Sequence, residues 1–448
     1  MADNINLKVT ISYKQILSIA LPISASIVLP QINFIINNIF LGSVNQQSLA
    51  AAGITGVYYL IFAVWGIGLN NGLQTLLSRR AGQDRVSEIG KLMAQSVRIS
   101  FIMALVGIII TWFLVPVLLK YSLHNQEIID KCVVFLRIRI FGLFFLYLYQ
   151  MRNALLVSAN LSKYLFIGTT AEAIVNIVFD YGLIKGRLGM PALGFNGAAY
   201  ASILAEFSGL LIIYVVIKVK KIDKTLQLFK FSGFDWQHSK MIIKQSMPLI
   251  AQHAISIISW QYFYFLVEHH GETALAVSNT MRNIFGFFGC FTWAFAATTN
   301  SMVSNIMGQN MQHQVPMLIR RIIHMSFGFS FLVFITLNLF PSVFLSIYSQ
   351  GDEFILQAIP VVRIVSAALL LMSISVVWFN AVIGSGNSKV SLTIELFCIT
   401  AYCIYVYVIL EKLQMSIVWG WASEWIYWSV MLTLSYLYMK YRNWNKVI

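Results

Sequence analysis

The stretch AEAIVNIVFDYGLI, residues 171–184, places three polar side chains inside an otherwise apolar segment. Glu172, Asn176 and Asp180 recur every fourth residue, so a helix would carry them along one face with about 6 Å of rise between neighbours. A carboxylate at the centre of an apolar span costs roughly 3 kcal/mol, so it needs a cavity, a partner or a bound cation. Because hard cations such as Na⁺ prefer carboxylate and carbonyl oxygens, the stretch is a candidate cation site.

The chain that carries this stretch has the composition of a polytopic membrane protein. Its 448 residues are 58% hydrophobic and 11% charged, and the mean hydropathy is +0.74. About twelve apolar stretches are long enough to cross a bilayer, and we predict an all-α protein with twelve transmembrane helices. No gap between them exceeds about 25 residues, which leaves no room for a soluble catalytic domain, so we expect no enzyme activity. The predicted spans are centred near residues 28, 62, 108, 145, 174, 206, 255, 288, 333, 370, 400 and 427.

The net charge of +14 is distributed unevenly along the chain. The N-terminus and every second loop carry about 20 cations against about five in the alternate loops, which is the positive-inside pattern. This pattern predicts a multi-pass protein of the bacterial inner membrane with both termini in the cytoplasm. Because no basic segment is long or interleaved with exposed aromatic residues, we expect no nucleic-acid partner.

The second half of the chain repeats the first. Pro22 matches Pro248 at an offset of 226, and NALLVSAN (153–160) matches NAVIGSGN (380–387) at an offset of 227. Each half holds six predicted spans, so the halves are parallel repeats related by a pseudo-two-fold axis along the membrane normal, and alternating access of two lobes is expected. We predict an N-lobe over 1–217, a cytoplasmic linker over 218–239, interpreted as a simple tether, and a C-lobe over 240–448.

Several motifs resemble one family of membrane transporters. NNIFLGSVNQQSLAAAG, residues 37–53, is similar to the first and second helices of multidrug and toxic compound extrusion (MATE) transporters. These typically read Asp-Thr-Ile-Phe-Val-Gly, a short loop and Leu-Ala-Ala-x-Gly. NIVFDYGLI with GFNGAAYAS resembles the family's fifth and sixth helices, and NAVIGSGNSK resembles the end of its tenth. The resemblance covers nearly the whole chain and implies an antiporter that exports amphipathic, often cationic molecules in exchange for Na⁺ or H⁺.

The resemblance also implies a cation site in the N-lobe. In the family this site uses a first-helix Asp, an Asn and an Asp of the fifth helix, and a sixth-helix hydroxyl. The matching positions here, which would bind the coupling ion, are Asn37, Asn176, Asp180 and Ser202. Asn37 departs from the family's acid and cannot titrate, so Na⁺ is favoured over H⁺ as the coupling ion. We expect no other cofactor.

The second half provides a control for this site. The repeat equivalents of Asn37, Asn176 and Asp180 are Phe263, Cys403 and Tyr407. The duplicated fold therefore does not need these polar groups for packing, which favours a functional role over a structural hydrogen bond.

Other polar and hinge residues leave alternatives open. Glu172 lies about 12 Å along the helix from Asp180, so it could replace the missing acid in a proton relay or, with Asn33, line a cavity for a cationic substrate. Pro22 and Pro30 interrupt the first helix below Asn37 and permit either a hinge or a static kink. For the remaining intramembrane charges a stabilising pair is favoured over substrate contact, and Arg137 and Arg139 could pair with lipid head groups.

Three rival functions are compatible with a polytopic chain. A lipid-linked oligosaccharide flippase of the same broad fold is the nearest, but such flippases usually have more spans and a cationic cavity, whereas the stripe here is acidic. An intramembrane enzyme lacks support because no nucleophile or metal-protease motif occurs. A scaffold or receptor would not need the acidic stripe. We therefore predict a transporter of amphipathic small molecules that contacts membrane lipid and functions as a monomer.

Overall fold

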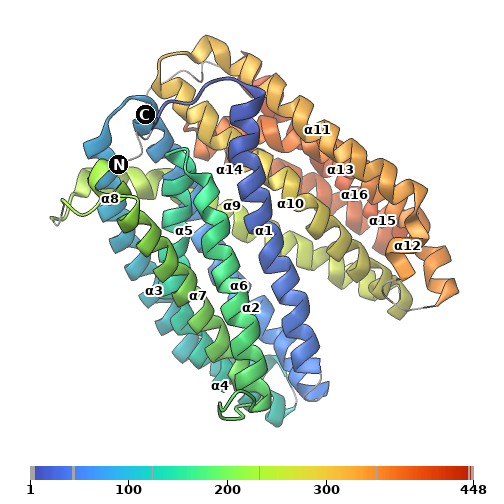
Figure 1. The fold of residues 1–448 in the computed structure, drawn as a ribbon. Coiled ribbons are helices and arrows are strands. Elements are labelled where there is room, and N and C mark those ends of the chain that lie inside the picture. The colour runs from blue at the N-terminus through green and yellow to red at the C-terminus, as the bar shows by residue number, and fades with distance from the viewer. Residues whose placement is uncertain are drawn as a thin grey trace. The chain divides into compact units, whose positions relative to one another are not determined.

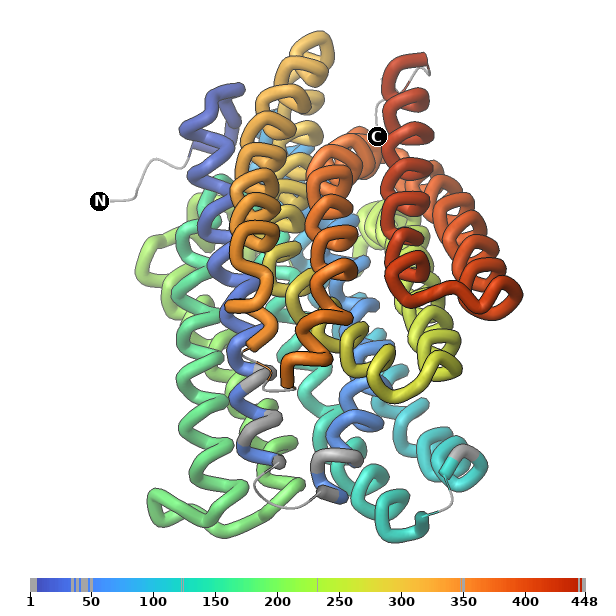
Figure 2. Tube along the Cα trace, turned by 90° about the vertical axis from the view of Figure 1, so that its right-hand side faces the viewer, coloured from blue at the N-terminus to red at the C-terminus, as the bar shows by residue number. Residues whose placement is uncertain are grey.

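The computed structural model describes residues 6–42, 46–123, 125–231, 233–346, 348, 351–441 and 444, and these form helices and loops without a strand. Figures 1 and 2 show the course of the long helices. The first half of the chain forms α1 (Tyr13–Gly42), α2 (Gln46–Gly82), α3 (Val86–Ser122), α4 (Gln126–Arg139), η1 (Ile140–Gly142), α5 (Leu143–Ser158), η2 (Ser162–Tyr164), α6 (Leu165–Lys185) and α7 (Phe195–Val219).

The second half repeats this order of elements. A short helix precedes it, and a π-helical turn ends one of its long helices. The elements are α8 (Ile222–Thr225), α9 (Trp236–Glu268), α10 (Glu272–Gly308), η3 (Gln312–Gln314), α11 (Val315–Leu339), α12 (Pro341–Ser346), α13 (Asp352–Gly384), α14 (Ser388–Val406), η4 (Tyr407–Lys412), α15 (Ile417–Trp421) and α16 (Ser423–Tyr441).

Nine helical segments of the described chain are long and apolar enough to cross a membrane. One of them, Gln126–Ser158, joins α4, η1 and α5 into a single span. With the long helices α9, α10 and α16, the segments match the twelve predicted spans, which confirms the all-α membrane class. Large apolar side chains point outward, as for Phe113 of α3, which is 77% exposed, because lipid solvates them.

Internal contacts divide the chain into two units. The N-terminal unit is Met1–Leu7 with Ala25–Ser246, and the C-terminal unit is Lys8–Ser24 with Met247–Ile448. The chain thus passes between units inside α1 and inside α9, in each case two residues from a member of the repeated pair Pro22 and Pro248. A proline removes one helical hydrogen bond, so both crossings lie where the helix is weakened. The lobe boundaries at 217 and 240 stay a prediction.

The linker between the halves is bound to the N-terminal unit. The Gln95 side-chain amide of α3 donates to the carbonyl of Gly233 at 3.0 Å. At the start of α9, the Asp235 carboxylate accepts from the backbone N–H of His238 at 3.1 Å, and this bond lowers the pKa of Asp235. The His238 ring also lies 3.4 Å from the Glu88 carboxylate of α3. The linker is therefore packed against α3, and its role as a simple tether stays a prediction.

Candidate cation site in the N-terminal unit

One hydrogen bond fixes the register between α1 and α6. Figures 1 and 2 show the two helices side by side and running in the same direction. The Asn33 side-chain N–H of α1 donates to Asn176 Oδ1 of α6 at 2.6 Å. Asn37 and Asp180 each follow one turn later, about 6 Å further along their helices. The shared register therefore brings Asn37 and Asp180 to the same depth on facing helices.

The polar atoms around this pair are buried without partners. Asp180 is fully buried and Asn176 is 3% exposed. Among the described residues, neither carboxylate oxygen of Asp180 has a hydrogen-bond partner, and the side-chain oxygens of Asn33 and Asn37 have none either. An unpaired buried polar group is costly, and a buried carboxylate costs more. Oxygen donors with one negative charge suit a monovalent hard cation, so the residues fit a bound Na⁺.

Close packing of α6 against α7 sets the depth of Ser202, the predicted ligand on α7. A Cβ on Gly197 of α7 would lie 2.6 Å from the carbonyl oxygen of Leu183 of α6, so only glycine permits this approach. Since α7 runs opposite to α6, Ser202 falls within about one turn of the depth of Asp180. Ser202 is half-buried. A hydrogen bond joins Asn33 and Asn176, two of the five predicted residues. The other three are Asn37, Asp180 and Ser202.

A second polar cluster lies deeper in the N-terminal unit. Arg139 at the end of α4 donates to both carboxylate oxygens of Glu206 on α7, at 3.0 and 2.6 Å. The Tyr59 hydroxyl of α2 also donates to Glu206 at 3.3 Å, and the Arg139 guanidinium lies 3.8 Å from the Tyr59 ring centroid. Both partners of this ion pair are nearly buried, with side-chain exposures of 12% and 7%. Of the alternatives for Arg139, the structure shows a stabilising pair with Glu206 of α7 and not a contact with lipid head groups.

Glu172 belongs to this deeper cluster and not to the Asp180 site. Its side chain lies against Gly209 of α7, where an added Cβ would be 3.2 Å from Glu172 Cβ. Glu172 interacts electrostatically with both Arg139 and Glu206. Because Arg139 is already bidentate to Glu206, the half-buried Glu172 is a second carboxyl group beside that ion pair.

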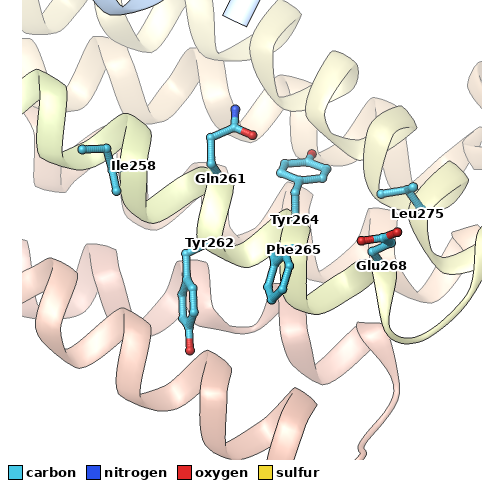
Figure 3. Close-up of a pocket in the computed structure, with 7 residues that line it drawn as sticks. All are labelled: Ile258, Gln261, Tyr262, Tyr264, Phe265, Glu268 and Leu275. Atoms are coloured by element: carbon cyan, nitrogen blue, oxygen red, sulfur yellow. The ribbon is translucent and has the colours of Figure 1, made fainter. Parts of the chain in front are cut away.

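The C-terminal unit contains a separate cavity of about 600 Å³ (Figure 3). Most of its lining comes from α9, and Leu275 adds to it from α10. Tyr264 and Phe265 contribute aromatic rings, and Glu268 contributes a carboxylate at the end of the helix. Sequence reasoning did not single out this cavity. The lining residues are Ile258, Gln261, Tyr262, Tyr264, Phe265, Glu268 and Leu275.

The fold and the site define a multi-pass membrane transporter built from two repeated halves. The chain belongs to the MatE family, whose model matches it twice, over residues 22–182 and over residues 248–408. The two matches begin at Pro22 and Pro248, which confirms the internal repeat.

Curated relatives match most of the chain at low identity. The Thermotoga maritima protein described as "Probable multidrug resistance protein NorM" is 23% identical over 441 residues, which cover 97% of this chain and 93% of that protein. "Probable multidrug resistance protein YoeA" of Bacillus subtilis is 20% identical over 410 residues, covering 89% and 87% of the two chains.

Solved structures share the fold over nearly the full length. An outward-facing multidrug resistance MATE family transporter superposes with a TM-score of 0.90 at 18% identity, covering 99% of this chain and 98% of that one. A transporter from Pyrococcus furiosus, described as having a binding pocket of reverse polarity, gives 0.89 at 18% identity with 98% of each chain covered. These structures establish the twelve-helix, two-lobe fold.

Proposed function

We propose that this protein is a secondary antiporter that exports amphipathic, cationic small molecules in exchange for Na⁺. The observation that carries the proposal is Asp180, a fully buried carboxylate whose two oxygens lack partners among the described residues. A coupling ion that binds there and leaves would account for keeping such a group inside the membrane. Return of one monovalent ion across about 150 mV releases roughly 3.5 kcal/mol, which is enough to drive uphill export.

Na⁺ is the proposed ion because the oxygens suit it. Asp180 supplies one negative charge, and the unpaired oxygens of Asn33 and Asn37 lie on the facing helix. We add Asn33 to the predicted ligands Asn37, Asn176, Asp180 and Ser202, and its hydrogen bond to Asn176 supports a role at this site rather than in a substrate cavity.

We propose a cationic cargo because a carboxyl group is present at two candidate binding places. Glu172 gives the deeper cluster of the N-terminal unit a second carboxyl group, which would be ionised when a cation binds beside it. In the C-terminal unit, the cavity of Figure 3 combines three aromatic rings with the Glu268 carboxylate. Aromatic faces and a carboxylate together favour an amphipathic cation. The curated relatives described as probable multidrug resistance proteins support export of small molecules.

We propose that the chain lies in a bacterial plasma membrane with both termini in the cytoplasm, as its distribution of cations indicates. Alternating access would bend α1 and α9 at Pro22 and Pro248, where each helix passes between units. Pro30 would add flexibility closer to Asn33 and Asn37. Solved MATE structures include one described as straight and one described as bent.

The proposal is tested with the purified full-length protein in liposomes. A Na⁺ gradient at constant pH, and separately a pH gradient without Na⁺, is imposed while the transport of a fluorescent amphipathic cation is recorded. We expect the Na⁺ gradient to drive transport. Transport driven by the pH gradient alone would identify H⁺, and not Na⁺, as the coupling ion. Absence of transport in both, together with translocation of a lipid-linked oligosaccharide, would establish a flippase instead.

We expect Glu172→Gln to weaken the apparent affinity for a monovalent organic cation about tenfold, because it removes a carboxyl group that would ionise beside the bound cation. The KM for a neutral amphipathic probe should stay the same. The matched control is Asp130→Asn, which removes an exposed charge of α4. An equal loss for both probes would show that Glu172 has a structural role.

A further inference from the structure

A buried carboxyl group joins three helices in the C-terminal unit. Glu395 of α14 is 1% exposed and lies inside the predicted span Ser388–Lys412. Its Oε1 atom lies 2.6 Å from the hydroxyl oxygen of Ser256 on α9 and 2.5 Å from that of Tyr427 on α16. The site is thus built from two hydroxyl groups around one carboxyl oxygen.

The Ser256 hydroxyl has one proton but lies within hydrogen-bond distance of two oxygens. Besides Glu395, it lies 2.9 Å from the backbone carbonyl of Gln252, one turn earlier on α9. A carbonyl can only accept, so when Ser256 donates to Gln252, a hydrogen bond to Glu395 requires the proton to come from the carboxyl. When the carboxyl is ionised, the Ser256 hydroxyl can rotate and donate to it. Both protonation states of Glu395 are therefore hydrogen-bonded at this site.

The surroundings of Glu395 offer no positive charge. Among the described residues, the groups that interact with it are the hydroxyls of Ser256 and Tyr427 and the thiol of Cys398 on α14 itself. The titratable neighbours are therefore Tyr427 and Cys398, and neither carries a positive charge. An ionised carboxylate without a cation is costly within a membrane span, so a proton is the natural counter-charge.

The internal repeat indicates that the fold does not require a carboxyl group at the position of Glu395. With the offset of 227, the equivalent of Glu395 in the first half is Gly168. A Cβ on Gly168 would lie 2.6 Å from Ile213, so this position of the N-terminal half packs tightly without a carboxyl group. The acid in the second half is therefore an addition to the fold.

We propose that Glu395, with Ser256 and Tyr427, forms a proton-binding site in the C-terminal unit, distinct from the cation site at Asp180. The carboxyl takes its proton from solution and returns it there, with Ser256 changing from acceptor to donor. Its place in a transport cycle rests on the proposed antiport, but proton binding itself does not.

The site is tested by infrared difference spectroscopy of the full-length protein in lipid nanodiscs, titrated between acidic and alkaline pH. The carbonyl stretch of a protonated carboxyl should appear and disappear reversibly, and Glu395→Gln should remove one such component. The Gln Oε1 atom can accept from both Tyr427 and Ser256 in place of the carboxyl oxygen, so the variant is expected to fold. In parallel, a pH indicator measures the protons released when tetraphenylphosphonium is added, and Glu395→Gln should reduce this release.

Two control variants isolate the site. Glu424→Gln removes another buried carboxyl of the same unit, which accepts from the Trp428 indole at 2.9 Å, and Asp180→Asn removes that of the cation site. Both should retain the component assigned to Glu395. Tyr427→Phe keeps the carboxyl and should displace the pH midpoint of that component by about one unit. A titration that is the same in wild type and Glu395→Gln, or a midpoint unmoved by Tyr427→Phe, would overturn the proposal whether or not export is observed.

Discussion

Asp180→Asn is expected to reduce ion-driven export in proteoliposomes about 100-fold. Asp180 is the one acid among the proposed ligands, because Asn37 occupies the position of the family's first-helix carboxylate. Without it, a bound Na⁺ would be held by neutral oxygens alone in a low-dielectric site. Loss of roughly 3 kcal/mol of charge neutralisation corresponds to about a 100-fold weaker site. The measurement is the initial rate of cation efflux under a fixed Na⁺ gradient.

A rescue variant makes this prediction sharper. Because Asn37 and Asp180 lie at the same depth on facing helices, Asn37→Asp in the Asp180→Asn background moves the charge across the site and should recover part of the rate. Thermal unfolding of both variants, followed in detergent, checks that they fold as the wild type does. Unchanged export by Asp180→Asn would remove the assignment of the coupling site, and a lack of rescue would place Asn37 outside it.

Arg139→Met is expected to destabilise the protein by about 3–5 kcal/mol, because it leaves Glu206 buried without a positive partner. Glu206 accepts two bonds from Arg139 and is 7% exposed, so water cannot replace the guanidinium. The double variant Arg139→Met/Glu206→Gln removes both charges and should recover most of the loss. The measurement is the free energy of unfolding in detergent.

An exposed ion pair of the same unit provides the matched control. Lys131 and Glu127 lie 2.9 Å apart on α4, with side-chain exposures of 30% and 59%. Solvent screens such pairs, so Lys131→Met should change stability by less than about 1 kcal/mol. Equal effects of Lys131→Met and Arg139→Met would contradict the view that burial makes the Arg139–Glu206 pair essential.

Much of this architecture could be predicted from the sequence because membrane spans are local. About twenty apolar residues suffice to define a span, and the duplicated Pro22 and Pro248 revealed the repeat. Asn176 and Asp180 are four residues apart, and this spacing likewise placed both side chains on one helix face. These features depend on composition and helical period, which are properties of a single segment.

The remaining features depend on which helices meet and at what register. Arg139 pairs with Glu206 across 67 positions, and no spacing rule links α4 to α7. Asn33 was predicted for a substrate cavity, and its contact with Asn176 follows from the register of α1 against α6. The docking of the linker on α3 rests on backbone carbonyls such as that of Gly233, which a sequence does not display.

The assignment of Lys8–Ser24 to the C-terminal unit bears on how the chain is assembled. The backbone N–H of Val9 donates to Asn305 of α10 at 3.1 Å, a partner synthesised 296 residues later. The earliest part of α1 must therefore wait for most of translation before its final neighbours exist. If the gene were divided within the linker, the downstream fragment would lack the segment Lys8–Ser24. The upstream fragment would then have to supply it.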